Sequence, residues 1–190
     1  MSLHRIASVR GGRRTLCHLG AVTLLLSATP PSSEAGDSLS VHLAPLAILL
    51  GNTYRGEIAG STAEHPVVDI TRWERALNGQ AIRVLHSVND GAYGGETMIL
   101  WDQEKDSLVF FYFTTGGFFT TGTMALEGRR LISREYVTGH PGGVTEVRVV
   151  SEIHDDGSFS TRTRILKNGV WSDVQSALYR RDPSARVVFR

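Results

Sequence analysis

The fold is indicated by residues 71–88, which read TRWERALNGQAIRVLHSV. Asn78-Gly79 is the strongest β-hairpin signal in the chain, because both central residues of a type I′ turn have positive φ, which Asn-Gly tolerates. A two-residue loop places Glu74 directly across from Arg83 on one face of the hairpin. The other, largely apolar face carries Trp73, Arg75, Leu77, Ile82, Val84, His86 and Val88. We predict that the apolar face is the interior and that the Glu74–Arg83 pair is a solvated ion pair.

Short strands and glycine-rich turns continue in the same way from Gly51 to Arg180. A three-residue loop at Asp155-Asp156-Gly157 sets Ser151 beside Thr161 and gathers charged side chains on one face. Lys167-Asn168-Gly169 joins the next two strands in the same manner. This pattern is typical of an antiparallel barrel or sandwich, and a count of about ten strands favours an all-β, antiparallel up-and-down barrel. Glycines inside strand patterns predict bulges or tight bends at Gly94, Gly95 and Gly122.

The first 35 residues have the order of a secretory signal peptide: basic residues, then the apolar run 16–26, then small residues. The run is shorter than the roughly 20 apolar residues that span a bilayer. We therefore expect cleavage after Ala28 or Ala35 and a mature protein that is periplasmic or secreted. Arg13-Arg14 leaves twin-arginine export open beside the Sec route.

The remaining chain divides into a barrel domain, 36–180, and a C-terminal tail, 181–190. Within the domain, residues 41–50 predict a short helical turn that plugs one end of the barrel, or alternatively an amphipathic segment that binds a partner. The hairpin 108–119 is apolar on both faces. Its outer face is covered by a dimer partner, the plug or loops, or else the hairpin is buried in a thick aromatic core.

Charge and cysteine content exclude several kinds of function. Of 20 basic and 19 acidic residues, four arginines and one glutamate lie in the first 35 positions, which leaves 16 basic and 18 acidic residues. A slightly acidic domain without a basic stripe does not favour nucleic acid or an anionic membrane as partner. Cys17 is the only cysteine, so the mature chain has no disulfide and no thiolate chemistry. The histidines are scattered singly, and we predict no metal site and no cofactor.

Three stretches resemble an uncharacterised bacterial family of lipocalin-like domains of unknown function, within the calycin-type group of ligand-binding barrels. They are HLAPLAILLGNTYRGE (42–57), WERALNGQAIRVLHSVNDGAYGGETMILWD (73–102) and FYFTTGGFFTTGTM (111–124). The likeness covers most of residues 43–179. Lipocalin-like proteins place Gly-x-Trp at the opening strand, whereas this chain has Gly51-Asn52-Thr53-Tyr54, so we expect Tyr54 to take the packing role of the tryptophan. The resemblance implies a barrel with a central pocket and supplies no catalytic residues.

The candidate ligand-binding residues are Trp73, Arg75, His86, Glu96 and Tyr112. If Asn89-Asp90-Gly91 is a three-residue loop, Val84 pairs with Glu96, and an Arg75–His86–Glu96 group faces inward. A two-residue loop instead sends Glu96 to the side of Arg83. The inward group either orients a polar ligand, acts in acid–base chemistry, or is a structural polar network.

The signal-like segment predicts export. The barrel and its pocket predict that the protein binds a small, largely apolar molecule with one polar end. An isomerase or hydrolase that uses His86 or Glu96 as acid or base is the first alternative. A protein-interaction module that docks through residues 108–119 is the second. The sequence contains no nucleophile elbow, phosphate-binding loop or zinc helix, and the catalytic residues of an enzyme therefore stay unassigned.

Overall fold

The computed structural model describes residues 38–138 and 142–190. The predicted signal peptide and its cleavage sites lie outside these residues. The described ranges contain ten β-strands and two 3-10 turns. The elements are η2 (Ala44–Leu49), β1 (Thr53–Ile58), β2 (Val68–Ala76), η3 (Leu77–Gly79), β3 (Ala81–Val88), β4 (Tyr93–Asp102), β5 (Ser107–Thr114), β6 (Phe119–Glu127), β7 (Arg130–Val137), β8 (Val144–Ile153), β9 (Phe159–Lys167) and β10 (Val170–Arg181).

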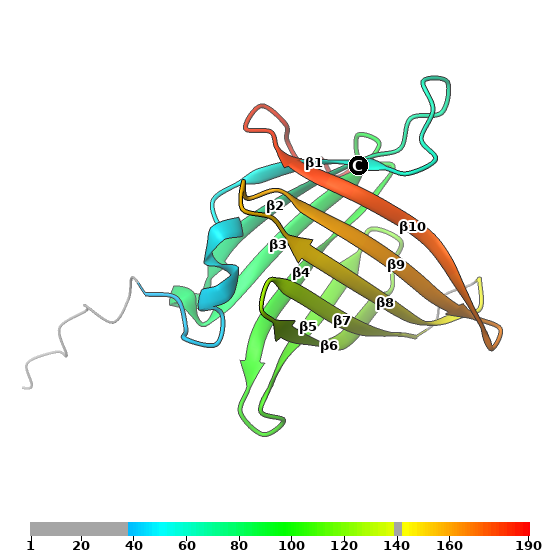
Figure 1. Cartoon of the computed structure of the whole chain (residues 1–190). Coiled ribbons are helices and arrows are strands. Elements are labelled where there is room, and N and C mark those ends of the chain that lie inside the picture. Colours follow the sequence, from blue (N-terminus) through cyan, green and yellow to red (C-terminus); the bar gives the residue numbers. More distant parts are fainter. Residues whose placement is uncertain (1–37, 139–141) are drawn as a thin grey trace, which may run out of the picture. The chain divides into compact units, whose positions relative to one another are not determined.

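The ten strands form a closed antiparallel barrel in which each strand pairs with the next in sequence and β10 pairs with β1 (Figure 1). The predicted fold class, an all-β up-and-down barrel of about ten strands, is confirmed. Closure leaves no unpaired sheet edge. Among the described residues, no helix is long and apolar enough to cross a bilayer.

The β2–β3 hairpin has the predicted register. Glu74 lies opposite Arg83, and Trp73 lies opposite Val84. The turn is of the type I′ kind: φ is 52° at Asn78 and 85° at Gly79, and the Gln80 N–H donates to the carbonyl oxygen of residue 77 at 3.0 Å. The ladder ends one pair earlier than expected, because Leu77 also has positive φ and leaves the strand.

Replacing Asn78 and Gly79 with two alanines is expected to lower the free energy of unfolding by roughly 1–3 kcal/mol, because both residues have positive φ. A Cβ at Gly79 would also overlap the carbonyl oxygen of Ser38. Urea midpoints measure the effect. Asn78→Gly is the matched control and should stay within about 0.5 kcal/mol of the parent, since glycine tolerates positive φ. An unchanged midpoint for the double alanine variant would contradict the assigned turn.

The β8–β9 hairpin also follows the prediction. Ser151 pairs with Thr161, and Ile153 pairs with Phe159 across a loop whose Gly157 has φ of 76°. Register shifts occur between Val144 and Glu146 and between Asp173 and Gln175. Of the bulge or tight bend predicted at Gly94, Gly95 and Gly122, the bulge is wrong, because the strands pair through these residues without a register shift.

Glycines on the inward face make room for aromatic rings from neighbouring strands. A Cβ at Gly56 would overlap the ring of Tyr179, its partner across the β1–β10 pair. A Cβ at Gly122 would overlap the ring of Phe110, its partner across the β5–β6 pair. Gly95 meets the ring of Tyr112 in the same way. The barrel interior is therefore packed by rings that lie over glycine backbone.

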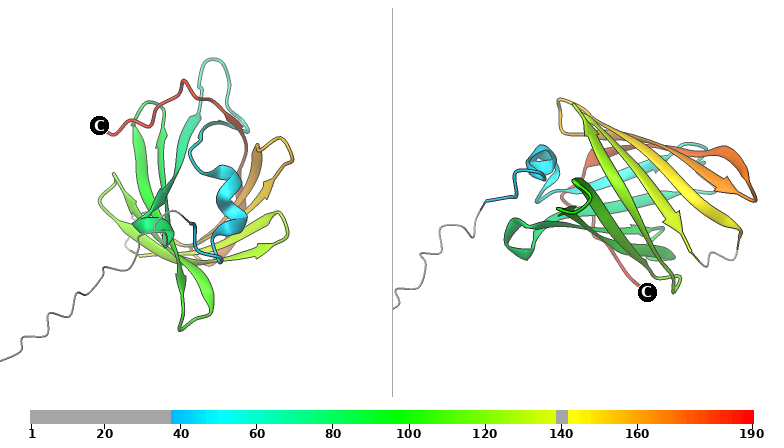
Figure 2. Two further views of the ribbon diagram at one scale, coloured as in Figure 1. Left: turned by 90° about the vertical axis from the view of Figure 1, so that its left-hand side faces the viewer. Right: turned by 90° about the horizontal axis from the view of Figure 1, so that it is seen from below.

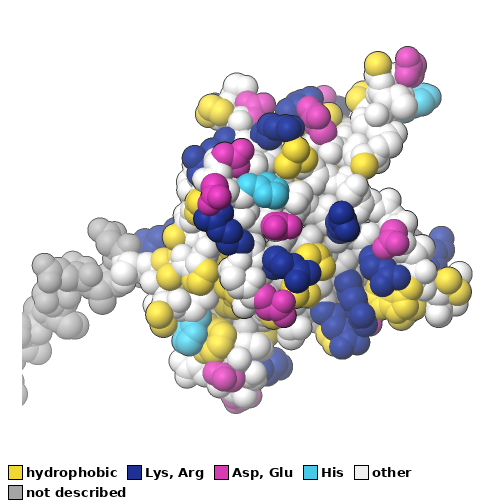
Figure 3. Space-filling view, in the orientation of Figure 1, with side chains coloured by type: hydrophobic (Ala, Val, Ile, Leu, Met, Phe, Trp, Pro, Cys, Tyr) yellow, Lys and Arg dark blue, Asp and Glu magenta, His cyan; other side chains and the backbone are white. Residues whose placement is uncertain are grey.

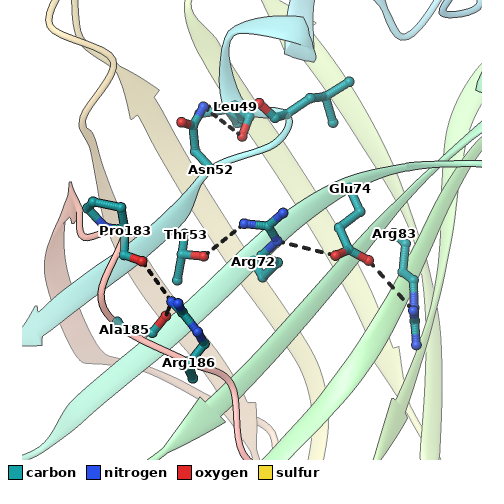
Figure 4. Close-up of polar contacts among 10 residues, drawn as sticks. Leu49, Asn52, Thr53, Arg72, Glu74, Arg83, Pro183, Ala185 and Arg186 are labelled. Atoms are coloured by element: carbon teal, nitrogen blue, oxygen red, sulfur yellow. Dashed lines mark hydrogen bonds and ion pairs between the residues drawn. The ribbon is translucent and has the colours of Figure 1, made fainter.

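The outward face of the strands is charged. Arg72 donates to Thr53 and Glu74, and Glu74 is 3.6 Å from Arg83 (Figure 4). Arg83 in turn donates to Glu96 at 2.7 Å. Acidic and basic side chains are interspersed over this surface (Figure 3). The predicted exterior ion pair of Glu74 and Arg83 is confirmed, and each such exposed pair contributes less than about 1 kcal/mol.

The η2 turn closes one end of the barrel (Figures 1 and 2). Its apolar side chains at Leu46 and Leu49, with the preceding Leu43, are buried in the main hydrophobic cluster. The Ser40 N–H donates to the carbonyl oxygen of Gly79, which ties the segment to the β2–β3 turn. The predicted plug is confirmed, and we call this end of the barrel the plug end.

Candidate ligand-binding cavity

The interior of the barrel contains a cavity of about 260 Å³. Its apolar lining includes Leu49, Trp73, Ile99, Leu131, Ile153 and Phe159. Its polar lining includes Asp69, Thr71, His86, Ser133, Ser151 and Tyr179. These residues come from η2 and most of the strands, so the cavity belongs to the barrel as a whole.

Polarity changes along the barrel axis. In β2, Trp73 lies near the plug end, while Asp69 is four residues further from it, a distance of about 13 Å at ~3.3 Å per strand residue. His86 of β3 lies across the sheet from Thr71, between these two levels. The plug end of the cavity is therefore apolar, and the opposite end is polar.

The polar end contains a chain of hydrogen bonds centred on His86. Its Nδ1 lies 3.1 Å from Asp69 Oδ1, and its Nε2 lies 2.7 Å from Tyr112 Oη. Tyr112 Oη lies 3.1 Å from Tyr93 Oη, and Tyr179 donates to Asp69 Oδ2 at 2.8 Å. Five side chains from five strands thus fix one another inside the barrel.

Burial raises the pKa of both Tyr112 and Tyr179 far above the usual range, so both stay phenols and each keeps a proton to donate. A neutral His86 donates a hydrogen bond from Nδ1 to Asp69 and accepts one at Nε2 from the Tyr112 hydroxyl. A protonated His86 instead donates to Tyr112, which then donates to Tyr93. The charge on His86 therefore sets the direction of hydrogen bonding along the chain.

A second carboxylate lies nearby on β7. Glu135 follows the cavity-lining Ser133 by two residues and so shares its face. Thr120 donates to Glu135 Oε1 at 2.5 Å. Burial raises the pKa of Glu135, and its interaction with His86 opposes that rise. The sequence prediction missed Asp69 and Glu135, although strand alternation from Thr71 would have placed Asp69 on the inner face.

Three of the five predicted site residues come together in the barrel. Trp73 and His86 line the cavity, and Tyr112 bonds to His86. Trp73 also packs edge to face against Phe159. Within the described residues, the Trp73 indole N–H is buried without a hydrogen-bond partner, so an acceptor atom on a ligand would satisfy it. A ligand-binding role for these residues stays a prediction.

The prediction that Arg75 joins His86 at the polar end is wrong. Arg75 has the inward register of Trp73, but it lies two residues closer to the plug end and is exposed. Its guanidinium donates to the carbonyl oxygen of Ser38 at 3.4 Å. The strand face was predicted correctly, whereas the depth of the residue along the barrel was not.

Of the two alternatives for the loop at Asn89-Asp90-Gly91, the three-residue loop, which pairs Glu96 with Val84, is wrong. Four residues separate the ladder pair Val88–Tyr93, which places Glu96 opposite Leu85 and on the outer face. Both Glu96 oxygens accept hydrogen bonds from Arg83. This is the side predicted for a two-residue loop, since loops of even length give the same strand face.

No group of His, Cys, Asp and Glu side chains in residues 38–138 and 142–190 has the arrangement of a metal site.

No protein-family model matches the chain. No curated protein matches it either. Among solved structures, the crystal structure of Rv2717c from M. tuberculosis is similar, with a TM-score of 0.55 and 14% sequence identity. The match covers 76% of this chain and 99% of that one, and at this identity it shows a common fold alone.

Proposed function

We propose that this protein binds a small, largely apolar molecule with one polar end inside the barrel. The observation that carries the proposal is the barrel cavity of about 260 Å³, apolar at the plug end and polar around Asp69 and His86. A water molecule takes about 30 Å³ in the liquid, so the cavity holds the volume of roughly nine waters. A ligand of about ten non-hydrogen atoms fits this space.

We also propose that the protein is a lipocalin-like barrel of the calycin type and that it is exported. The lipocalin-like stretches 42–57, 73–102 and 111–124 support a ligand-binding barrel of the calycin type. The signal-like order of residues 1–35 supports export to the periplasm or beyond. Tyr54 supports the resemblance as well, because it is fully buried and packs edge to face against Phe159, as the tryptophan of a Gly-x-Trp motif would.

Binding ranks ahead of catalysis because both nitrogens of His86 already have partners. A general base needs a free nitrogen within reach of substrate, whereas Nε2 is occupied by Tyr112. Glu96, the other proposed acid or base, lies on the outer face.

Exposed aromatic side chains favour a second candidate, protein interaction. The hairpin 108–119 is buried on its inward face at Leu108 and Phe110. On its outward face Phe111, Phe113 and Phe119 are 41%, 51% and 56% exposed. Phe113 and Phe119 lie against each other with ring centres 6.3 Å apart. A patch of this kind is typical of a contact surface for another protein, including a second copy of this chain.

Filling the cavity should weaken ligand binding. Ser151 lines the cavity from β8, and Ser151→Phe places a ring where the ligand lies. We expect the affinity for 1-octanol, a neutral amphiphile of suitable size, to fall by roughly tenfold or more. Isothermal titration calorimetry measures it. Ser160→Phe, at an outward position on the adjacent strand β9, is the matched control and should keep the parent affinity. Equal 1-octanol affinity in both variants would contradict the assigned site.

A further inference from the structure

We propose that the polar end of the ligand is an amine, so that the cavity selects a small cationic amphiphile over a fatty acid. This inference rests on the proposed ligand-binding function and specifies the chemical class of the ligand. It follows from the charges that the barrel places on its inner face.

Acidic groups gather at the polar end of the cavity. Asp69 lines it directly, with its side chain 13% exposed. Glu135 shares the inner face of β7 with Ser133. Its Oε1 accepts from Thr120, which leaves acceptor capacity on the carboxylate, because a carboxylate has about four lone-pair sites.

Basic groups are kept away from the same space. Among the described residues that line the cavity, none is lysine or arginine. Arg75 lies on the same inward face of its strand as Trp73, and Arg181 lies on the same inward face as Tyr179. Both arginines are nevertheless exposed at the plug end. Lys167 has the inward register of Thr161, but it is exposed at the β9–β10 turn, six residues or about 20 Å along the strand.

A ligand carboxylate would therefore enter a site lined by Asp69, with Glu135 on the same inner face, and would meet no lysine or arginine among the described residues that line the cavity. Like charges in such a site are strongly unfavourable. An ammonium group instead meets Asp69 and Glu135 as hydrogen-bond acceptors, and charge-assisted hydrogen bonds are the stronger kind. A neutral alcohol should therefore bind with an affinity between those of the carboxylate and the ammonium ligand.

The experiment compares three eight-carbon probes with different head groups: octylamine, 1-octanol and octanoate. Calorimetric titration of the full chain at pH 7 should rank their affinities in that order, with octylamine at least roughly tenfold tighter than octanoate. This ranking needs no variant. Octanoate that binds as tightly as octylamine would overturn the amine assignment while leaving the cavity function in place. Failure of all three probes to bind would overturn the proposed function itself.

Glu135→Gln tests whether Glu135 binds the ammonium group of the ligand. We expect it to lower the affinity for octylamine by roughly tenfold and to leave the affinity for 1-octanol within about twofold of the parent. The reason is that the amide keeps the shape of the side chain and loses its charge. Glu152→Gln, on the outward face of β8, is the matched control and should change neither affinity. Equal losses for octylamine and 1-octanol in Glu135→Gln would show a structural role and overturn the assignment of this residue.

The pH dependence of the affinity for octylamine gives a second test of the role of Glu135. Because burial raises the pKa of Glu135, octylamine affinity should rise as the pH passes upward through that pKa and the carboxylate ionises. The titratable groups that interact with it are His86 and Tyr112, which hydrogen bonds join in turn to Asp69 and Tyr93. Glu135→Gln should reduce the slope, and an unchanged slope would contradict the role of Glu135.

Discussion

Gly56→Val is expected to lower the free energy of unfolding by roughly 3–5 kcal/mol, one of the two largest effects that we predict. Even a single Cβ at this position overlaps the ring of Tyr179 on the adjacent strand. That ring cannot move freely, because it stacks on Phe159 with centres 4.5 Å apart and its hydroxyl donates to Asp69. The substitution therefore overpacks the core and breaks a buried hydrogen bond to the polar end of the cavity.

Urea unfolding of matched variants measures this effect. Glu57→Val, at the next and outward position of β1, should change stability by about 0.5 kcal/mol or less, because it touches no core ring. Tyr179→Ala should cost less in the Gly56→Val background than in the parent, since the displaced ring is already lost. Additive costs in that double-mutant cycle would show that Gly56 and Tyr179 are not coupled.

The fold could be predicted from the sequence because turn chemistry and strand alternation give the same answer. Asn78-Gly79 determines the register of β2 and β3, and that register puts the apolar side chains on a single face. Asp155-Asp156-Gly157 does the same for β8 and β9. Two independent local signals therefore identify the inward faces of these two hairpins, and about ten short strands are a number suited to closure into a barrel.

The candidate site could be predicted only in part, for two physical reasons. Alternation tells which face a residue occupies but not its depth, so Arg75 was assigned to the cavity although it lies at the plug end. The side of Glu96 depends on the length of the loop 89–92, and an error of one residue turns every later side chain to the other face. Asp69 and Glu135 lie at strand positions where the sequence shows no local signal of function.

Leu49→Ala tests the apolar end of the cavity, and it should lower the free energy of unfolding by about 2–5 kcal/mol. Leu49 is 2% exposed, belongs to the main hydrophobic cluster and lines the cavity from the plug. Ile48→Ala is the matched control on the same turn. Because Ile48 is 40% exposed, its truncation should cost well under half as much. Equal losses for the two variants would contradict the placement of the plug.

The same variant should also change which ligand fits. If the apolar tail of the ligand points at the plug, the space left by the Leu49 side chain accepts two more methylenes. Each buried methylene contributes about 0.8 kcal/mol, so 1-decanol should gain roughly tenfold in affinity over 1-octanol in Leu49→Ala, relative to the same ratio in the parent. Ile48→Ala should keep the parent ratio. An unchanged ratio in Leu49→Ala would mean that the tail does not reach the plug, and that the head group does not lie at Asp69 and Glu135 in the orientation we propose.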